Sequence, residues 1–377
     1  MSIKENLQSK NKEMPVNLKE LLSNKKFIPI YSSRKNLNKN KLGPVAVELH
    51  WTSICNYNCI HCSYGNRRQM RKRLSNEVIN SVLKDLITLD VKGVYLSGGG
   101  EPTTVTGWDK YALELINNNV KVALITNGVA LKELHLAVLR KMNYIAVSVY
   151  SIDEREYEEI TSGKGFEEQF LLPALLKQEY NNTIIGARCV LNTINYRHVL
   201  SIYQGAMKAG FDYIIFIPVV DYEGIGIDLQ AEDISCLHEL LIMHYDKFDF
   251  SKTNVDVLIN RKSHYYEVTD YREFMTNPQA GCKAIQVRGN AFINYDGGVY
   301  LCQPYIGIER YCIGNINEMR FEEIWNSQRH LDVIELLNQD FVSGLCKNCR
   351  SINFNKAADE YDRNRLTVPA IIKDVFI

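Results

Sequence analysis

The sequence lacks the features of a secreted or membrane-spanning chain. Its first residues, MSIKENLQSK, contain no apolar run of the kind that forms a secretory signal, and the longest strongly apolar stretch, YIIFIPVV at 213–220, is far too short to span a bilayer. We therefore expect a cytoplasmic protein with no membrane partner. In that reducing compartment, closely spaced cysteines are more often metal ligands or catalysts than disulfides.

Net charge is also absent, since 44 Lys and Arg residues balance 44 Asp and Glu residues. This balance gives no general argument for a nucleic-acid partner. Local charge is uneven, because residues 1–42 carry ten basic and only three acidic side chains. The composition predicts a basic N-terminal extension over residues 1–44, with one short helix at 16–24 and the remainder solvated.

From Val45 onward the sequence alternates between apolar strands and amphipathic helices. Strands are expected at 45–51, 93–98, 121–127, 144–151, 183–192 and 213–220. Helices are expected at 76–89, 108–118, 131–142, 154–180 with a break at Gly163 and Gly165, and 196–210. This alternation predicts an α/β fold with a parallel sheet covered by helices. Six such units fit either an open doubly wound sheet or an incomplete barrel, and periodicity alone does not choose between them.

A smaller module is expected after an irregular linker at 221–279, which contains one probable helix at 233–246. The segment beginning GCKAIQVRGNAFINYDGGVYLCQ alternates like a β-hairpin that turns at DGG. A helix near 321–337 and the motif CKNC follow it. We therefore expect a large domain at 45–220, a satellite domain at 280–355 and a C-terminal tail at 356–377.

Polar and cysteine-containing segments follow successive strands of the expected sheet. The first strand leads into a three-cysteine loop, the second into SGGGEPT and the third into TNG; the fourth ends in SVYS and the fifth in RCVLN. In a parallel sheet with right-handed crossovers, every such segment lies at the same carboxyl edge. The sequence therefore predicts one site at this edge.

Three thiols, Cys55, Cys59 and Cys62, lie within eight positions of the first loop. A cubane iron–sulfur cluster suits them, because each of its four irons takes one protein ligand and one iron would then remain open. The alternative is a zinc site completed by His61. A disulfide fits less well, because three is an odd number in a reducing compartment.

The segment GGGEP is also typical of an ordinary tight turn after a strand. Its functional interpretation is that glycines let backbone groups approach a ligand closely. Glu101 adds a negative charge that an ammonium group would complement. Its place one strand after the cysteine loop favours the functional interpretation.

These residues resemble the radical S-adenosylmethionine (SAM) enzymes. Their CxxxCxxC motif is met by Cys55, Cys59 and Cys62, and the match in order extends through GGGEP and covers most of 45–220. The resemblance implies a partial (β/α)6 TIM-like barrel in which SAM chelates the open iron of a 4Fe-4S cluster. It implies cofactor-binding roles for His61, Gly99, Gly100, Glu101, Thr126, Asn127, Ser148, Ser151 and Arg188. The family's strand-five pattern GxIxGxxE is absent from TIIGARCVLN, so the resemblance rests on the first two motifs.

The second module resembles the auxiliary cluster domain called SPASM, or its truncated form, twitch. Its cysteines are Cys282, Cys302, Cys346 and Cys349. The resemblance implies a second, auxiliary 4Fe-4S cluster held by these four residues, and the lack of any cysteine after Cys349 favours the twitch form. A four-cysteine zinc site is the alternative.

Three cysteines fall outside both motifs. Cys189 and Cys236 are expected to be core residues, as free cysteines often are. Cys312 is the candidate thiol for returning a hydrogen atom, with ordinary loop packing as its alternative. A basic run follows the cysteine loop and comprises Arg67, Arg68, Arg71, Lys72 and Arg73. We expect these side chains to be solvated. If they pointed toward the site instead, they would favour a phosphate-bearing or acidic substrate.

The resemblance implies reductive cleavage of SAM to a 5'-deoxyadenosyl radical that abstracts a hydrogen atom from substrate carbon. Because iron–sulfur potentials span about −700 to +450 mV and this step needs the low end, flavodoxin or ferredoxin is the expected electron donor. The leading hypothesis is an oxidative modification in a biosynthetic pathway, either dehydrogenation of a sugar or aminocyclitol or maturation of a peptide. The short N-terminal extension favours the small molecule. The alternatives are a redox-neutral epimerase that uses Cys312 and a non-catalytic iron–sulfur or zinc scaffold.

Overall fold

The computed structural model describes residues 18–21, 23–36, 42–65, 70–179, 182–221, 224–259, 278–346, 349 and 351–368. Its centre is a sheet of nine strands in the order β6-β5-β4-β3-β2-β1-β7-β8-β9. The first six strands are parallel and are β1 (Ala46–Leu49), β2 (Gly93–Leu96), β3 (Lys121–Thr126), β4 (Tyr144–Ser148), β5 (Ile184–Leu191) and β6 (Tyr213–Pro218). All six lie within the strands expected from the sequence.

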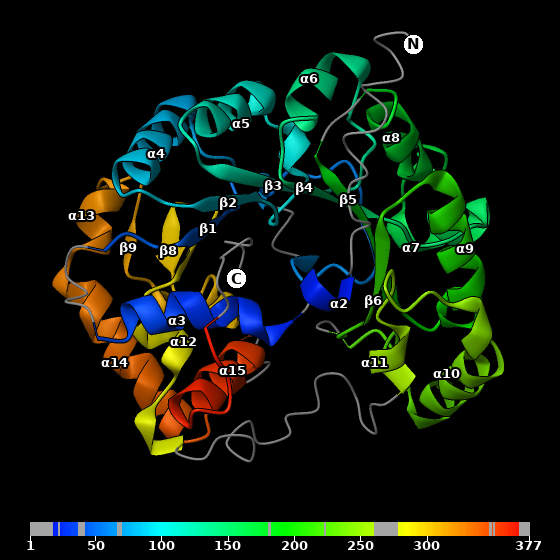
Figure 1. Cartoon of the computed structure of the whole chain (residues 1–377). Helices are drawn as coiled ribbons and strands as arrows, with labels where there is room; N and C mark the ends of the chain where they lie inside the picture. The colour runs from blue at the N-terminus through cyan, green and yellow to red at the C-terminus, as the bar shows by residue number, and fades with distance from the viewer. Residues whose placement is uncertain are drawn as a thin grey trace, which may run out of the picture.

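The strand order decides between the two architectures that periodicity left open. Strands β1 to β6 follow one another across the sheet without the reversal that defines a doubly wound fold. With right-handed crossovers in one direction, the helices gather on one face and the sheet curls around the other. Figure 1 shows the helices following β2 to β5 outside the curved sheet. The fold is therefore an open, partial barrel.

The helices of the barrel cover its outer face. They are α4 (Asn76–Thr88), α5 (Trp108–Asn117), α6 (Leu136–Leu139), α7 (Glu154–Thr161), α8 (Glu168–Leu176) and α9 (Val199–Ala209), followed by α10 (Ala231–Met243) and α11 (Val255–Ile259). The break expected at Gly163 and Gly165 separates α7 from α8. The helix expected at 131–142 is shorter than its pattern suggests and consists of a 3-10 turn, η5 (Glu133–His135), and α6. Among the residues that the structure describes, no helix has both the length and the apolar character of a transmembrane span.

Alternate residues of each barrel strand face the two sides of the sheet. On β1, Val47 and Leu49 are fully buried under the helices, whereas Glu48 between them faces the concave side and is partly exposed. The parallel register places Glu48 beside Tyr95 of β2, and Ser148 of β4 beside Arg188 of β5. The concave side of the barrel therefore carries charged and hydroxyl side chains among apolar ones, although the strands read as continuous apolar runs.

The second module is not a separate satellite, because it continues the sheet of the barrel. Its first strand, β7 (Asn290–Ile293), pairs in parallel with β1, and the predicted hairpin joins β7 to antiparallel β8 (Gly298–Tyr300). The remaining elements are β9 (Gly314–Asn315), α12 (Lys283–Gln286), α13 (Phe321–Trp325), α14 (Gln328–Val342) and α15 (Ile352–Asp362). One continuous apolar core runs through the barrel and this module.

A buried carboxylate joins the barrel to α13. Asp85 of α4 is completely buried and accepts hydrogen bonds from Nε of Arg320, at 3.1 Å, and from the backbone amide of Glu322, at 3.2 Å. The charge at the helix N-terminus and the guanidinium together satisfy the carboxylate. This contact fixes the two modules relative to each other.

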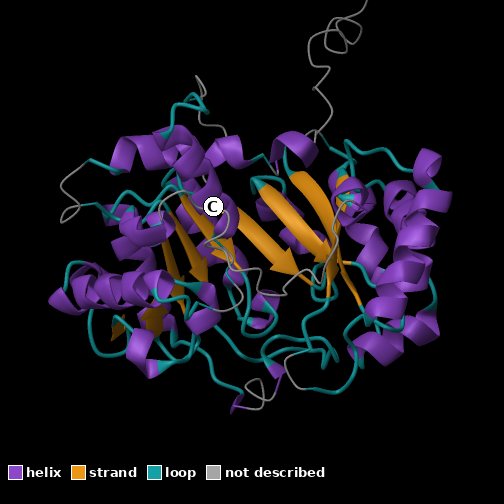
Figure 2. Ribbon diagram, turned by 90° about the horizontal axis from the view of Figure 1, so that it is seen from below, coloured by secondary structure: helices purple, strands orange, loops and turns teal. Residues whose placement is uncertain are grey.

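The described part of the N-terminal extension contains a helix within the expected range 16–24 but contradicts the expectation that the remainder is solvated. It forms α2 (Leu18–Leu21), η1 (Asn24–Phe27) and α3 (Ile28–Arg34), and α3 buries Ile28, Ile30 and Tyr31. Helix α15 packs against η1 and α3, so residues 356–362 of the expected C-terminal tail are also part of the folded structure. Figure 1 shows α3 and α15 next to each other on the open side of the curved sheet, which is the side from which Figure 2 views the strands.

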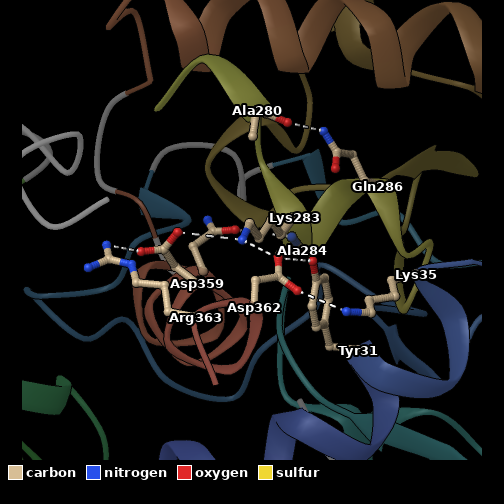
Figure 3. A network of polar contacts seen from close by, with 10 residues as sticks. Tyr31, Lys35, Ala280, Lys283, Ala284, Gln286, Asp359, Asp362 and Arg363 are labelled. Carbon is tan, nitrogen blue, oxygen red and sulfur yellow. Dashed lines mark hydrogen bonds and ion pairs between the residues drawn. The ribbon is translucent and has the colours of Figure 1, made fainter. Parts of the chain in front are cut away.

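An ion-pair network fastens these two segments, as Figure 3 shows. Lys283 of α12 lies between Asp359 and Asp362, with Nζ at 3.5 Å and 2.6 Å from their carboxylates. Asp362 also accepts a 2.6 Å hydrogen bond from the Tyr31 hydroxyl and pairs with Lys35 at 3.0 Å. Burial alone would raise the pKa of Asp362, but these partners outweigh it and lower the pKa. The carboxylate therefore stays ionised.

Replacing Lys283 by Met should destabilise the protein, because Asp359 and Asp362 would lose their shared buried partner. Arg363 and Lys35 still pair with these acids, so we expect a loss near the lower end of the about 3–5 kcal/mol measured when a buried pair is broken. Urea unfolding measures it. The exposed Lys92–Asp90 pair supplies the control, since Lys92→Met should change the unfolding free energy by about 1 kcal/mol or less. Equal effects of the two variants would contradict the proposed clamp.

Candidate functional site

A cavity of about 340 Å³ lies at the carboxyl edge of the barrel strands. Most of the residues expected there line it, together with several that the sequence did not single out. The expected residues are Cys55, Cys59, His61, Cys62, Gly99, Gly100, Glu101, Thr126, Asn127, Ser148 and Arg188. The convergence of the post-strand loops predicted from the sequence is therefore confirmed.

The cysteine loop is held in place by the end of α7. Backbone amides of Asn58 and Ile60 donate to the carbonyls of Thr161 and Ile160, both at 3.0 Å. The Tyr57 ring fills the space beside Gly163, where any side chain would collide with it. Its hydroxyl is 2.8 Å from that of Tyr157. The glycine break in the fourth helix thus makes room for a tyrosine of the cysteine loop.

The glycines of GGGEP bring the second loop against the start of the first. Gly99 has φ +79°, and a Cβ there would lie 2.5 Å from the carbonyl oxygen of Thr52. Gly100 is equally close to the backbone of Ile54, whose carbonyl accepts a 3.0 Å hydrogen bond from the Glu101 amide. The motif is therefore a cradle that only glycine fits, and both glycines line the cavity together with the cysteines.

Glu101 is buried and accepts four hydrogen bonds from its own and the next loop. Its carboxylate takes them from the amide and hydroxyl of Thr103, at 3.1 and 2.6 Å, from the Thr126 hydroxyl at 2.7 Å and from the Asn127 amide at 2.9 Å. Burial raises its pKa even though these donors oppose the rise. In this structure the carboxylate joins the loops after β2 and β3, a role that the sequence did not indicate.

Charged side chains face each other across the concave side of the cavity. Burial would raise the pKa of Glu48, but His50, Ser97 and Arg188 outweigh it and lower the pKa. Burial would lower the pKa of Arg188, but nearby tyrosines and Glu48 raise it. Both groups therefore stay charged. Among the described residues, Nε of Arg188 is buried without a hydrogen-bond partner, so it is available to an anionic ligand.

Glu48 is connected to the cysteine loop through one histidine. Its Oε1 is 2.8 Å from Nε2 of His50, and Nδ1 of that ring is 2.7 Å from the Tyr64 hydroxyl. Because an ionised carboxylate only accepts hydrogen bonds, Nε2 of His50 donates to Glu48, and Nδ1 shares the second hydrogen bond with the Tyr64 hydroxyl. The sequence analysis missed this group, although a glutamate within an apolar strand was the signal for it.

Tyr150 and Gln303 also line the cavity and were not predicted. Tyr150 packs its ring against His61, with centroids 4.6 Å apart, and burial together with the nearby Cys59 and Cys62 raises its pKa. Gln303 follows Cys302 directly and reaches the cavity from the second module. The residue that follows Cys302 therefore lines the same cavity as Cys55, Cys59 and Cys62.

The four cysteines of the second module lie near one another. Burial raises the pKa of Cys302, and Cys282, Cys349 and Cys346 raise it further by their proximity. Asn338 and Asn355 support Cys282, the first by accepting from its amide at 2.9 Å and the second by donating to its Sγ at 3.4 Å. Within the described part of the chain, no three His, Cys, Asp or Glu side chains come close enough to hold a single metal ion.

Two expected site residues lie elsewhere. Ser151 does not line the cavity, because its hydroxyl donates to Glu156 at 2.7 Å and accepts from the Asp153 amide at the start of α7. Cys312 does not line it either; its Sγ is 3.2 Å from the Gly314 carbonyl, where it approaches Tyr300. A hydrogen-donor role for Cys312 therefore has no geometric support.

The remaining expectations concern residues outside the site. Cys189 is fully buried and the partly buried Cys236 packs against the main core, as predicted. Of the basic run, Arg71, Lys72 and Arg73 are exposed, which agrees with the solvated interpretation. Arg67 and Arg68 lie outside the described residues.

The donor set fits the cofactors that the sequence suggested. The closely spaced thiols of the first loop provide ligands for a cluster. The glycine cradle lets a ligand approach the backbone, and the buried Nε of Arg188 is a donor for the carboxylate of an amino acid. The second set supplies four buried or half-buried thiols with a supporting asparagine shell.

Comparison with protein families matches residues 49–224 to the Radical SAM superfamily. Residues 282–350 match an iron–sulfur cluster-binding domain, SPASM. The matched order, a SPASM domain after a radical SAM domain, agrees with the resemblance seen in the sequence.

Two curated relatives are similar over most of their length. The cysteine-type anaerobic sulfatase-maturating enzyme of Clostridium novyi is 26% identical over 79% of this chain and 83% of its own. The mycofactocin maturase MftC of Mycolicibacterium smegmatis is 22% identical over 81% of this chain and 75% of its own.

Solved structures share the fold at low sequence identity. Streptococcus suis SuiB bound to its precursor peptide SuiA aligns with a TM-score of 0.60 and 15% identity, covering 93% of this chain and 82% of that one. Native anSMEcpe with bound AdoMet aligns with a TM-score of 0.59 and 19% identity, covering 83% and 88%.

Two glycines with nearly the same backbone conformation test the cradle. Gly99 and Gly107 have φ of +79° and +80°, but only a Cβ at Gly99 would meet neighbouring atoms. Gly99→Ala should displace the cysteine loop and greatly weaken SAM binding. Gly107→Ala should cost only the about 1–2 kcal/mol of left-handed strain. Isothermal titration with SAM after anaerobic reconstitution compares them, and equal SAM affinity in both variants would contradict a cradle role.

Proposed function

Because the chain belongs to the radical SAM superfamily and carries a SPASM domain, we propose that it oxidises a carbon atom of a peptide or protein substrate. Cys55, Cys59 and Cys62 would hold the SAM-binding 4Fe-4S cluster, and Cys282, Cys302, Cys346 and Cys349 an auxiliary one. When bound, these cofactors supply a 5'-deoxyadenosyl radical that removes a hydrogen atom and an acceptor for the remaining electron. A flavodoxin or ferredoxin is the proposed electron donor.

The position of Gln303 is the observation that carries the proposal of an oxidation. This residue follows Cys302 and lines the same cavity as Cys55, Cys59 and Cys62. A substrate in that cavity would lie between the two cysteine sets. An auxiliary electron acceptor on the far side of the substrate suits a net oxidation and has no role in a redox-neutral epimerisation.

Side chains of the cavity would bind and orient the partners. The free Nε of Arg188 would donate to the SAM carboxylate, and the backbone of Gly99 and Gly100 would face its amino group. Glu48 would accept the proton that leaves a substrate N–H or O–H group next to the oxidised carbon. His50 supports this role by donating to Oε1 of Glu48, which keeps the carboxylate ionised until it takes the proton.

The comparisons favour a peptide over a sugar or aminocyclitol. Two relatives that match about four fifths of the chain are named as maturases, a third of equal coverage is named as a heme synthase, and SuiB was solved with a precursor peptide. This preference reverses the expectation drawn from the short N-terminal extension. The epimerase alternative lacks a hydrogen donor, because Cys312 lies outside the cavity. The family assignment argues against a non-catalytic scaffold.

Converting Cys55, Cys59 and Cys62 to Ala together should abolish reductive cleavage of SAM, because no ligands for the first cluster would remain. The second set should still bind iron. Anaerobic reconstitution, iron and sulfide counting, and measurement of 5'-deoxyadenosine after dithionite reduction test this. Cys236→Ala, outside both sets, is the control and should keep full cleavage. Bound zinc without SAM cleavage in the native protein would refute the proposed function.

Co-expression with peptides encoded beside its gene should yield a product lighter by two hydrogen atoms. Mass spectrometry of the peptide measures this loss. Cys312→Ser should give the same product, since its thiol lies outside the cavity. The opposite result would establish the epimerase. The product would then keep the mass of the substrate in ordinary water and take up one deuterium in heavy water, and the Cys312→Ser variant would not form it.

A further inference from the structure

A second cavity, of about 120 Å³, lies beside the first. Glu48 and Gln303 line both cavities, so the two meet at these side chains. Three phenylalanines from distant parts of the sequence enclose the second cavity: Phe27 of η1, Phe292 of β7 and Phe354 of α15. Cys302, a proposed ligand of the auxiliary cluster, also lines this cavity, whereas the other six proposed cluster ligands do not.

The two ends of the described chain build one wall of this cavity. The rings of Phe27 and Phe354 pack with centroids 5.3 Å apart, and the Tyr31 ring meets Phe354 edge to face at 6.3 Å. The network around Lys283 and Asp362 in Figure 3 fastens α3 to α15 directly beside these rings. The wall is thus held by ion pairs, of which Lys283–Asp359 is buried and Lys35–Asp362 is partly exposed.

Size and charge define what the cavity accepts. A cavity of about 150 Å³ lined by apolar side chains binds benzene, so 120 Å³ suits a single ring or a bulky aliphatic side chain. Aromatic walls favour an aromatic occupant through offset and edge-to-face contacts. Among the described lining residues, Glu48 carries the only formal charge, so an anionic group would be repelled.

We propose that the second cavity is a subsite for an aromatic side chain of the peptide substrate. Glu48, at the junction, accepts a hydrogen bond from a polar hydrogen of the same substrate residue. This arrangement would present the adjoining carbon to the first cavity. The proposal rests on the proposed function, because it assumes that the substrate is a peptide.

Small aromatic probes test the subsite on the anaerobically reconstituted full chain. Saturation-transfer NMR should detect binding of toluene and 4-methylphenol, and much weaker binding of benzoate, which Glu48 repels. Ala284 lines the cavity, and Ala284→Leu should reduce toluene affinity at least tenfold by filling it. The same substitution at the exposed Ala231 should leave toluene binding unchanged. Glu48→Gln should restore binding of benzoate.

Two further measurements keep the outcomes separate. Phe27→Leu retains an apolar side chain but removes one ring wall, and should weaken toluene binding if Ala284→Leu proves unstable. Formation of 5'-deoxyadenosine in the same samples reports the proposed function independently. Equal toluene binding in the native protein, Ala284→Leu and Phe27→Leu, or benzoate bound as well as toluene, would overturn the subsite even where SAM is cleaved.

Discussion

The parallel pairing of β7 with β1 is the contact on which the rest of the site depends. It aligns Phe292 with Glu48 and continues the barrel sheet into the second module. Because β7 and β8 are joined by a tight hairpin, this pairing also brings Gln303 to the first cavity and Cys302 to the second. Without it, the two cysteine sets would belong to independent domains.

The inner face of the barrel combines two requirements that oppose each other in an ordinary core. The strands need apolar burial in order to pack, and their residues under the outer helices supply it. Binding and proton transfer need charge, and Glu48 and Arg188 supply it on the concave side. Each stays ionised because the other and its hydrogen-bonding or aromatic neighbours offset the effect of burial on its pKa.

Three glycines near the site allow close packing between different segments of the chain. Gly99 and Gly100 admit the backbone of the cysteine loop, and Gly163 admits the ring of Tyr57. The sequence showed that GGGEP was a close-approach motif and that Gly163 broke a helix. It could not show that both features position the same loop, since that depends on contacts across the barrel.

Much of the fold was predictable, because strand alternation and amphipathic helices depend on residues near one another in the sequence. The six strands, the hairpin at DGG and the convergence of the cysteine loop with GGGEP all followed from such patterns. Two site expectations depended on less. The resemblance implied Ser151 and the loop position suggested Cys312, whereas the structure places the Ser151 hydroxyl on Glu156 and the Cys312 Sγ beside the Gly314 carbonyl, outside the cavity.

The sequence by itself determined the chemistry of this protein: three thiols in one loop, four in a second module, and a glycine motif one strand from the first set. Ligand type and spacing are local properties. Only the tertiary structure decided that the barrel is open, that β7 joins it, that Glu48 faces Arg188, and that both ends of the chain close a second cavity. Those outcomes depend on packing contacts between residues that lie hundreds of positions apart in the sequence. Neither composition nor periodicity predicts such contacts.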